Sequence, residues 1–92
     1  MKFINTNIES VKIIKPEIHS DARGNFFESF KSTLFYDNQI PNTFTQDNEV
    51  RSKGSVLRGL HYQLKKPQGK LVRVIFGSVL DVAVDILSLI HI

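Results

Sequence analysis

Alternation of apolar and polar side chains constrains the fold of this chain more than any other feature. In residues 79–86 the carboxylates Asp81 and Asp85 share one face, and branched apolar residues fill the other. Successive side chains of a β-strand point to opposite faces, so this period of two predicts a half-buried strand. Comparable runs predict further strands at residues 11–14, 26–30, 43–50, 56–63 and 70–76. Short strands separated by glycine, proline and asparagine turns are typical of an all-β sandwich or barrel.

One short helix is expected among these strands. Ser32 is a candidate N-cap, an apolar face follows it, and Pro41 marks the end. Asp21-Ala22-Arg23-Gly24 has the composition of a turn. Five phenylalanines are interpreted as core residues, although one of them could cover a nucleobase: Phe26, Phe27, Phe30, Phe35 and Phe44.

Length and the lack of cysteine exclude several classes of protein. A chain of 92 residues makes at most one small domain. With no cysteine there is no disulfide scaffold, no all-cysteine zinc site and no thiol nucleophile. No apolar run approaches the roughly 20 residues of a membrane helix, and polar Asn5, Thr6 and Asn7 interrupt any signal-peptide pattern. We therefore expect a cytoplasmic protein with no membrane partner.

The basic residues favour a small anionic ligand. The net charge is +3, and the basic residues are dispersed rather than grouped in a block. Between Glu49 and Asp81 there are seven basic residues and no acidic one. This local excess suits an anionic small molecule better than a duplex, so no nucleic-acid partner is expected.

The segment richest in chemical groups surrounds His61. It reads Arg-Gly-Leu-His-Tyr-Gln at 58–63 and Gly-Lys-Leu-Val-Arg-Val at 69–74. Histidine is the usual general base near neutral pH, and a nearby cation could hold a phosphate or stabilise an enolate. A packed or surface histidine is the competing interpretation. In a regular strand Arg58 and His61 would point to opposite faces, unless Gly59 kinks the chain.

A metal site is not expected. Strand-borne sites often use two histidines separated by one residue, but Gln63 occupies the position that would pair with His61. His19 lies in a turn and His91 in an atypical tail, so neither completes a ligand set.

Two further clusters have both a functional and an ordinary interpretation. Arg23 in a glycine turn is well placed for bidentate phosphate contact, or it is a solvated arginine paired with Asp21. The amides of Gln46-Asp47-Asn48 can hydrogen-bond a base or a sugar, but such triplets are also common in loops.

Taken in order, these motifs closely resemble the dTDP-4-dehydrorhamnose 3,5-epimerase family. The motifs are Asp-x-Arg-Gly-x-Phe-x-Glu at 21–28, Gln-Asp-Asn at 46–48, Val-Leu-Arg-Gly-Leu-His-Tyr-Gln at 56–63, Gly-Lys-Leu-Val-Arg-Val at 69–74 and Asp-Val-Ala-Val-Asp-Ile at 81–86. The resemblance implies a cupin-type jelly roll (a double-stranded β-helix), a homodimer, and no metal or organic cofactor. It also implies epimerisation at C3 and C5 of dTDP-4-dehydro-6-deoxy-D-glucose, an isomerase reaction of dTDP-rhamnose biosynthesis.

The resemblance also implies a role for individual residues. His61 looks like the base that removes a proton alpha to the C4 ketone, and Lys70 like the cation that stabilises the enolate oxygen. Contacts to the diphosphate, sugar and thymidine are implied for Arg23, Glu28, Gln46, Asp47, Asn48 and Arg58. Part of this set is expected to act across the dimer.

Other family features have no counterpart here. The catalytic acid, a tyrosine, and the carboxylate that orients the base lie in the second half of the family's fold; Tyr36 and Tyr62 do not match the tyrosine motif. We expect residues 1–86 to be the N-terminal part of a single truncated domain, inactive alone, and residues 87–92 to be a non-native tail. The alternatives are a single-carbon epimerase, a ketoisomerase of the same cupin type, a non-catalytic nucleotide-sugar-binding module and a purely structural jelly roll.

Overall fold

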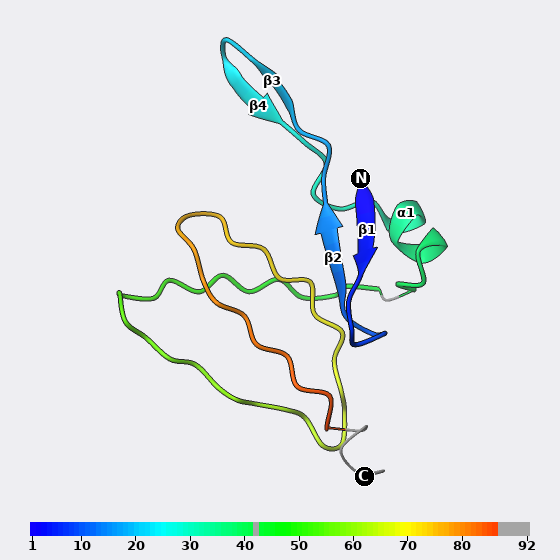
Figure 1. The fold of residues 1–92 in the computed structure, drawn as a ribbon, viewed down its shortest axis with the longest axis vertical. Helices are drawn as coiled ribbons and strands as arrows, with labels where there is room; N and C mark the ends of the chain where they lie inside the picture. The colour runs from blue at the N-terminus through cyan, green and yellow to red at the C-terminus, as the bar shows by residue number, and fades with distance from the viewer. Residues whose placement is uncertain (42, 87–92) are drawn as a thin grey trace.

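The computed structural model describes residues 1–41 and 43–86. The regular elements follow one another as β1 (Lys2–Asn5), β2 (Lys12–Lys15), β3 (His19–Asp21), β4 (Gly24–Phe26) and α1 (Ser32–Asp37). Figure 1 shows two hairpins and the helix in one part of the molecule, and long looped passes of chain beside them. The regular structure is thus mainly strand with one short helix, as predicted, and the described residues form no closed barrel.

The first hairpin pairs β1 with β2 in antiparallel register, with Phe3 opposite Ile14. The strand at β2 is confirmed. The sequence pattern missed β1, because Lys-Phe-Ile-Asn does not alternate. Thr6 organises the connection: its hydroxyl oxygen lies 2.8 Å from the carbonyl oxygens of Ile8 and Val11 and accepts the Ile8 N–H.

The second hairpin pairs β3 with β4 through a loop of two residues. Asp21 is opposite Gly24, which confirms the predicted turn at 21–24. His19 was expected in a turn, but it is the first residue of β3 and pairs with Phe26. Gly24 has φ of 140°, a backbone conformation that favours glycine. The predicted strand at 26–30 is wrong beyond Phe26, because β3 begins at His19 and offers no partner further along.

The helix is shorter than a typical globular helix, and its N-terminus differs from the expectation. Lys31, with extended φ and ψ of −146° and 115°, occupies the N-cap position without a side-chain bond, so Ser32 is the first helical residue rather than the cap. At the other end the Asn38 side chain donates to the Leu34 carbonyl at 2.8 Å. The Ile40 N–H bonds the Phe35 carbonyl at 2.8 Å, which ends the helix before Pro41.

Phenylalanine rings form the centre of packing. Phe35 is 1% exposed, and its ring meets those of Phe3 and Phe30 edge to face at centroid distances of 5.3 and 4.7 Å. The ring of Phe44, in the segment that follows α1, also packs here, with its centroid 5.7 Å from that of the Phe30 ring. The core interpretation is confirmed for Phe35 but is wrong for Phe26, which lies on the hairpin and is 68% exposed, and for Phe30, which is exposed although its ring contacts Phe35.

Residues 43–86, called the looped segment below, differ most from the expectation. The chain runs out and back in long extended passes (Figure 1), and the predicted strands at 43–50, 56–63, 70–76 and 79–86 are not strands. Between the described residues of this segment no backbone hydrogen bond forms, and a strand without a bonded neighbour has no ladder. Apolar side chains consequently face solvent, with Leu57 93% and Phe76 98% exposed. Residues 87–92, the predicted tail, lie outside the described residues.

Candidate functional site

The predicted site residues divide between the second hairpin and the looped segment. Arg23 lies in the β3–β4 loop and Glu28 follows β4. The looped segment carries Gln46, Asp47, Asn48, Arg58, His61 and Lys70. All eight side chains are exposed, which leaves their polar groups available to a ligand.

Among the candidate residues, Arg23 makes the most hydrogen bonds, all of them to Asp21. The Arg23 Nη2 and Nε donate to Asp21 Oδ2 at 2.7 and 3.2 Å. The Arg23 backbone N–H donates to Asp21 Oδ1 at 2.8 Å, an Asx turn that defines the loop. The hydrogen bond from the Arg23 side chain, followed by that from its backbone N–H, lowers the pKa of the Asp21 carboxyl. The predicted pairing of Arg23 with Asp21 is therefore confirmed.

The amide triplet is organised locally. Gln46 Nε2 donates to Asn48 Oδ1 at 3.1 Å, across the intervening Asp47. This bond holds two amides in one orientation at the solvent-facing surface of the looped segment, where they still retain unused donors and acceptors.

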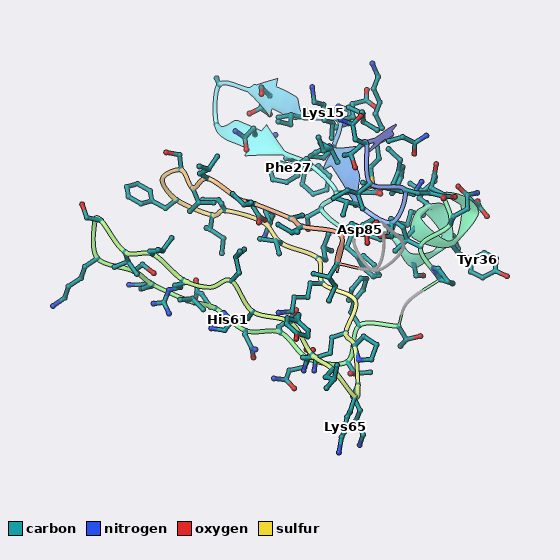
Figure 2. All side chains as sticks on the ribbon, turned by 60° about the horizontal axis from the view of Figure 1, so that its bottom comes forward. Lys15, Phe27, Tyr36, His61, Lys65 and Asp85 are labelled. Carbon is teal, nitrogen blue, oxygen red and sulfur yellow. The ribbon has the colours of Figure 1, made fainter. Side chains whose placement is uncertain are left out.

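Arg58 and His61 flank Gly59, whose backbone departs from that of a regular strand. Gly59 has φ of 105°, so the alternation of a regular strand does not apply between the two side chains. The His61 imidazole folds back towards the glycine, since a Cβ built there would lie 3.6 Å from His61 Nδ1. Figure 2 shows His61 on a pass that lies away from the hairpins. In the part of the chain that the structure describes, no bond joins His61 to Arg58 or Lys70.

Two side-chain contacts near these residues were not predicted from the sequence. Ser52 Oγ accepts a hydrogen bond from Arg58 Nε at 3.0 Å, which ties one pass to the next. The Arg73 guanidinium carbon lies 5.8 Å from the centre of the Phe27 ring, which joins the looped segment to the end of the second hairpin. Arg73 falls within the cationic motif at 69–74, but no sequence pattern identifies Phe27 as its partner.

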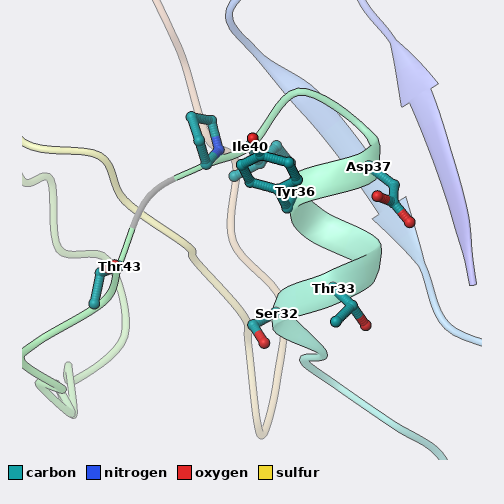
Figure 3. Close-up of a pocket in the computed structure, with 7 residues that line it drawn as sticks. Ser32, Thr33, Tyr36, Asp37, Ile40 and Thr43 are labelled. Carbon is teal, nitrogen blue, oxygen red and sulfur yellow. The ribbon is translucent and has the colours of Figure 1, made fainter.

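Two surface hollows accompany these elements. One, of about 330 Å³, lies beside α1 and is lined by Ser32, Tyr36 and Thr43 among others (Figure 3). It contains none of the predicted site residues. The other, of about 280 Å³, lies on the second hairpin and includes Arg23.

The described residues contain neither a cluster of metal-ligating side chains nor a membrane-spanning helix. Across residues 1–41 and 43–86, no three histidine, aspartate or glutamate side chains gather closely enough to hold a metal ion. No helix in that part of the chain has the length and apolarity needed to cross a membrane.

These features define a protein whose regular structure is mainly strand and which exposes a hydrogen-bonded arginine and further cationic side chains to solvent. A family profile described as dTDP-4-dehydrorhamnose 3,5-epimerase matches residues 5–88. The chain belongs to this family, and the resemblance noted in the sequence is confirmed.

Individual relatives agree with this assignment. A dTDP-4-dehydrorhamnose 3,5-epimerase of Methanothermobacter thermautotrophicus is 52% identical over 85 residues, which cover 92% of this chain and 46% of that protein. The enzyme of the same name from Escherichia coli K12 is 49% identical over 88 residues, covering 94% and 48%. That of Neisseria gonorrhoeae is 49% identical over 85 residues, covering 92% and 26%. The chain thus spans about half the length of most curated relatives it matches. No solved structure matches it.

Proposed function

We propose that this chain contributes to the epimerisation of dTDP-4-dehydro-6-deoxy-D-glucose at C3 and C5, which yields dTDP-4-dehydro-L-rhamnose. The supporting observation is the family match over residues 5–88, which includes every motif that carries the candidate residues. The relatives named as 3,5-epimerases cover more than nine-tenths of this chain.

The chemistry requires a base and a stabilised enolate. A C–H bond alpha to the C4 ketone breaks, its electron pair forms the enolate, and we assign the proton to His61. The Lys70 ammonium stabilises the enolate oxygen, a contribution of about 3–4 kcal/mol in a water-excluded pocket. A proton returned on the opposite face inverts the carbon, and the acid that supplies it is assigned outside residues 1–86.

Binding of the nucleotide part is assigned to the remaining candidates. The exposed guanidinium groups of Arg23 and Arg58 suit the diphosphate, which carries the negative charge of the substrate. Glu28 and the 46–48 triplet suit the thymidine and its sugar, because carboxylate and amide groups can satisfy their donors and acceptors. This division is supported by the local order of the Arg23 and Gln46 side chains.

A cupin-type jelly roll, a homodimer and a cytoplasmic location complete the proposal. Residues 1–86 would form part of one domain whose other strands cover the exposed apolar side chains of the looped segment. The large exposed fractions of Leu57 and Phe76 support this assignment, because an apolar strand face requires a partner. The coverage of about half of most relatives supports it as well.

A chimera provides the test, with residues 1–86 joined to the remaining half of the Methanothermobacter relative. Proton exchange at C3 and C5 of the dTDP-4-keto sugar in D₂O is followed by NMR. We expect exchange at both carbons, and its loss by about 10²–10⁴-fold in His61→Ala, the usual contribution of a positioned base. Tyr62→Phe is the matched control for the neighbouring ring, and Lys65→Ala is the control for Lys70→Ala.

The other functions give different results in the same experiment. Exchange at one carbon alone would identify a single-carbon epimerase or a ketoisomerase. Binding of dTDP without exchange would identify a non-catalytic nucleotide-sugar-binding module, and either result would overturn the proposed 3,5-epimerisation.

A further inference from the structure

The guanidinium of Arg23 is held along one of its edges. Both side-chain bonds to Asp21 Oδ2 come from the edge of the guanidinium that carries Nε and Nη2. The Nε–Oδ2 distance is 3.2 Å and the Nη2–Oδ2 distance is 2.7 Å. The same aspartate anchors the backbone of Arg23 through Oδ1 at 2.8 Å. One carboxylate therefore orients both the main chain and the side chain of this arginine.

The outer edge of the guanidinium faces solvent. Nη1 has no hydrogen-bond partner among the described residues, and the Arg23 side chain is 90% exposed. The outer edge, formed by Nη1 and Nη2, has the spacing that binds two oxygens of one phosphate group. The 53% exposed Asp21 side chain lies behind it, on the Nε side.

We propose that Asp21 is a positioning residue, which orients Arg23 so that its outer edge binds the diphosphate of the nucleotide sugar. This inference builds on the diphosphate role given to Arg23 in the proposed function. Asp21 itself touches no substrate in this arrangement; it acts through Arg23 by reducing the conformational freedom that the arginine would lose on binding.

The charge of Asp21 makes the proposal sharply testable. Hydrogen bonds from Arg23 lower the pKa of Asp21, so its carboxyl is ionised at neutral pH. A carboxylate near a diphosphate repels it. If Asp21 acted only by its charge, removing that charge would strengthen nucleotide binding. A positioning role predicts the opposite sign.

The test measures dTDP affinity by calorimetry on the same chimera. Asp21→Asn keeps an oxygen that can accept the Arg23 backbone N–H and loses the ion pair, so the turn is retained. We expect dTDP affinity to fall by about 3- to 10-fold, the cost of ordering one long side chain on binding. Asp21→Glu should recover part of the loss. In an Arg23→Ala background, Asp21→Asn should have no further effect.

The control is Asp37→Asn, which removes the same charge from α1 and should leave affinity unchanged. Unchanged or tighter binding by Asp21→Asn would overturn the proposal, as would an equal loss with and without Arg23. Turnover of the unmutated chimera is measured separately. A chimera that binds dTDP but does not exchange protons contradicts the epimerase function alone.

A second measurement uses the 92-residue chain itself and needs no chimera. The Arg23 Nε–H resonance is followed by ¹⁵N NMR during titration with acid and then with dTDP. We expect the resonance to shift as Asp21 gains its proton, and to lose that response in Asp21→Asn. An Nε–H resonance whose chemical shift does not change when Asp21 is protonated would overturn the proposal.

Discussion

The hairpin region and the looped segment have similar sequence patterns but different structures. Residues 1–41 contain β1–β4 and α1, and they bury Phe35. Residues 43–86 alternate at least as regularly, yet they form extended passes with exposed apolar side chains. The difference shows that alternation specifies which side of a strand is apolar, whereas the ladder needs a neighbour. β2 and β4 each pair with a strand that lies only a few residues earlier in the chain. The looped segment has no such neighbouring strand among the described residues.

The largest expected effect comes from the aromatic cluster of the hairpin region. Phe35→Ala should destabilise this region by about 3–5 kcal/mol, the usual cost of truncating a buried phenylalanine. Phe76→Ala, at a side chain that is 98% exposed, should cost close to nothing. Urea unfolding followed by NMR signals of the two hairpins measures both. Equal losses would show that the two regions pack alike, contrary to the comparison.

A smaller effect is expected from glycine substitutions at positive φ. Gly24→Ala forces a side chain into φ of 140° within a paired hairpin, at a cost of about 1–3 kcal/mol. Gly77→Ala, at φ of 87° in the looped segment, has no ladder to disturb. Cross-strand nuclear Overhauser effects between His19 and Phe26 should disappear in the first variant and persist in the second. Their persistence in Gly24→Ala would show that the hairpin tolerates a side chain there.

The contact that joins the two regions should contribute less. Arg73→Gln removes the cation above the Phe27 ring, an interaction worth about 0.5–1 kcal/mol at an exposed site. We expect chemical-shift changes at Phe27 together with unchanged hairpin pairing. Lys70→Gln serves as the control, because it removes a charge from the same pass. Identical shifts at Phe27 in both variants would contradict a specific Arg73 contact.

The smallest effect is a pH dependence confined to the second hairpin. The pKa of Asp21 is lowered in the folded chain by the bonds from Arg23, so folding is favoured above the ordinary carboxyl pKa of about 3.9 and this contribution is lost as pH falls through the lowered value. ¹³C NMR titration of the Asp21 carboxyl should show the depression. Arg23→Gln should bring the pKa of Asp21 back towards its ordinary value. A pKa that stays low in this variant would show that a group other than the Arg23 side chain lowers it.

The parts predicted correctly depend on local chemistry. The turn at 21–24 follows from aspartate and glycine at its ends, β2 from a β-branched pair before Pro16, and the helix from its apolar face. The cap at Ser32 was assigned one residue too late, because helix boundaries depend on backbone geometry that composition does not specify. β1 has no pattern of its own and becomes a strand only because β2 pairs with it.

The candidate site was predicted as a set of residues but not as an arrangement. The motifs indicated Arg23, His61 and Lys70 as candidates, since each residue type carries its chemistry at any position. The pairing of Asp21 with Arg23 could be anticipated from their spacing of two residues, and the structure confirmed this pairing. The contact of Arg73 with Phe27 joins positions far apart in the chain, and no local pattern encodes it.

The sequence by itself determined the β-rich character, the local turns, the family and the identity of the candidate residues. These depend on side-chain type and on spacings of a few residues. Tertiary structure alone decided which extended runs became strands, which phenylalanine was buried, and which ring lies beside the Arg73 guanidinium. Each of these outcomes depends on a partner brought close in space, and the free energy of burial or pairing exists only once that partner is present.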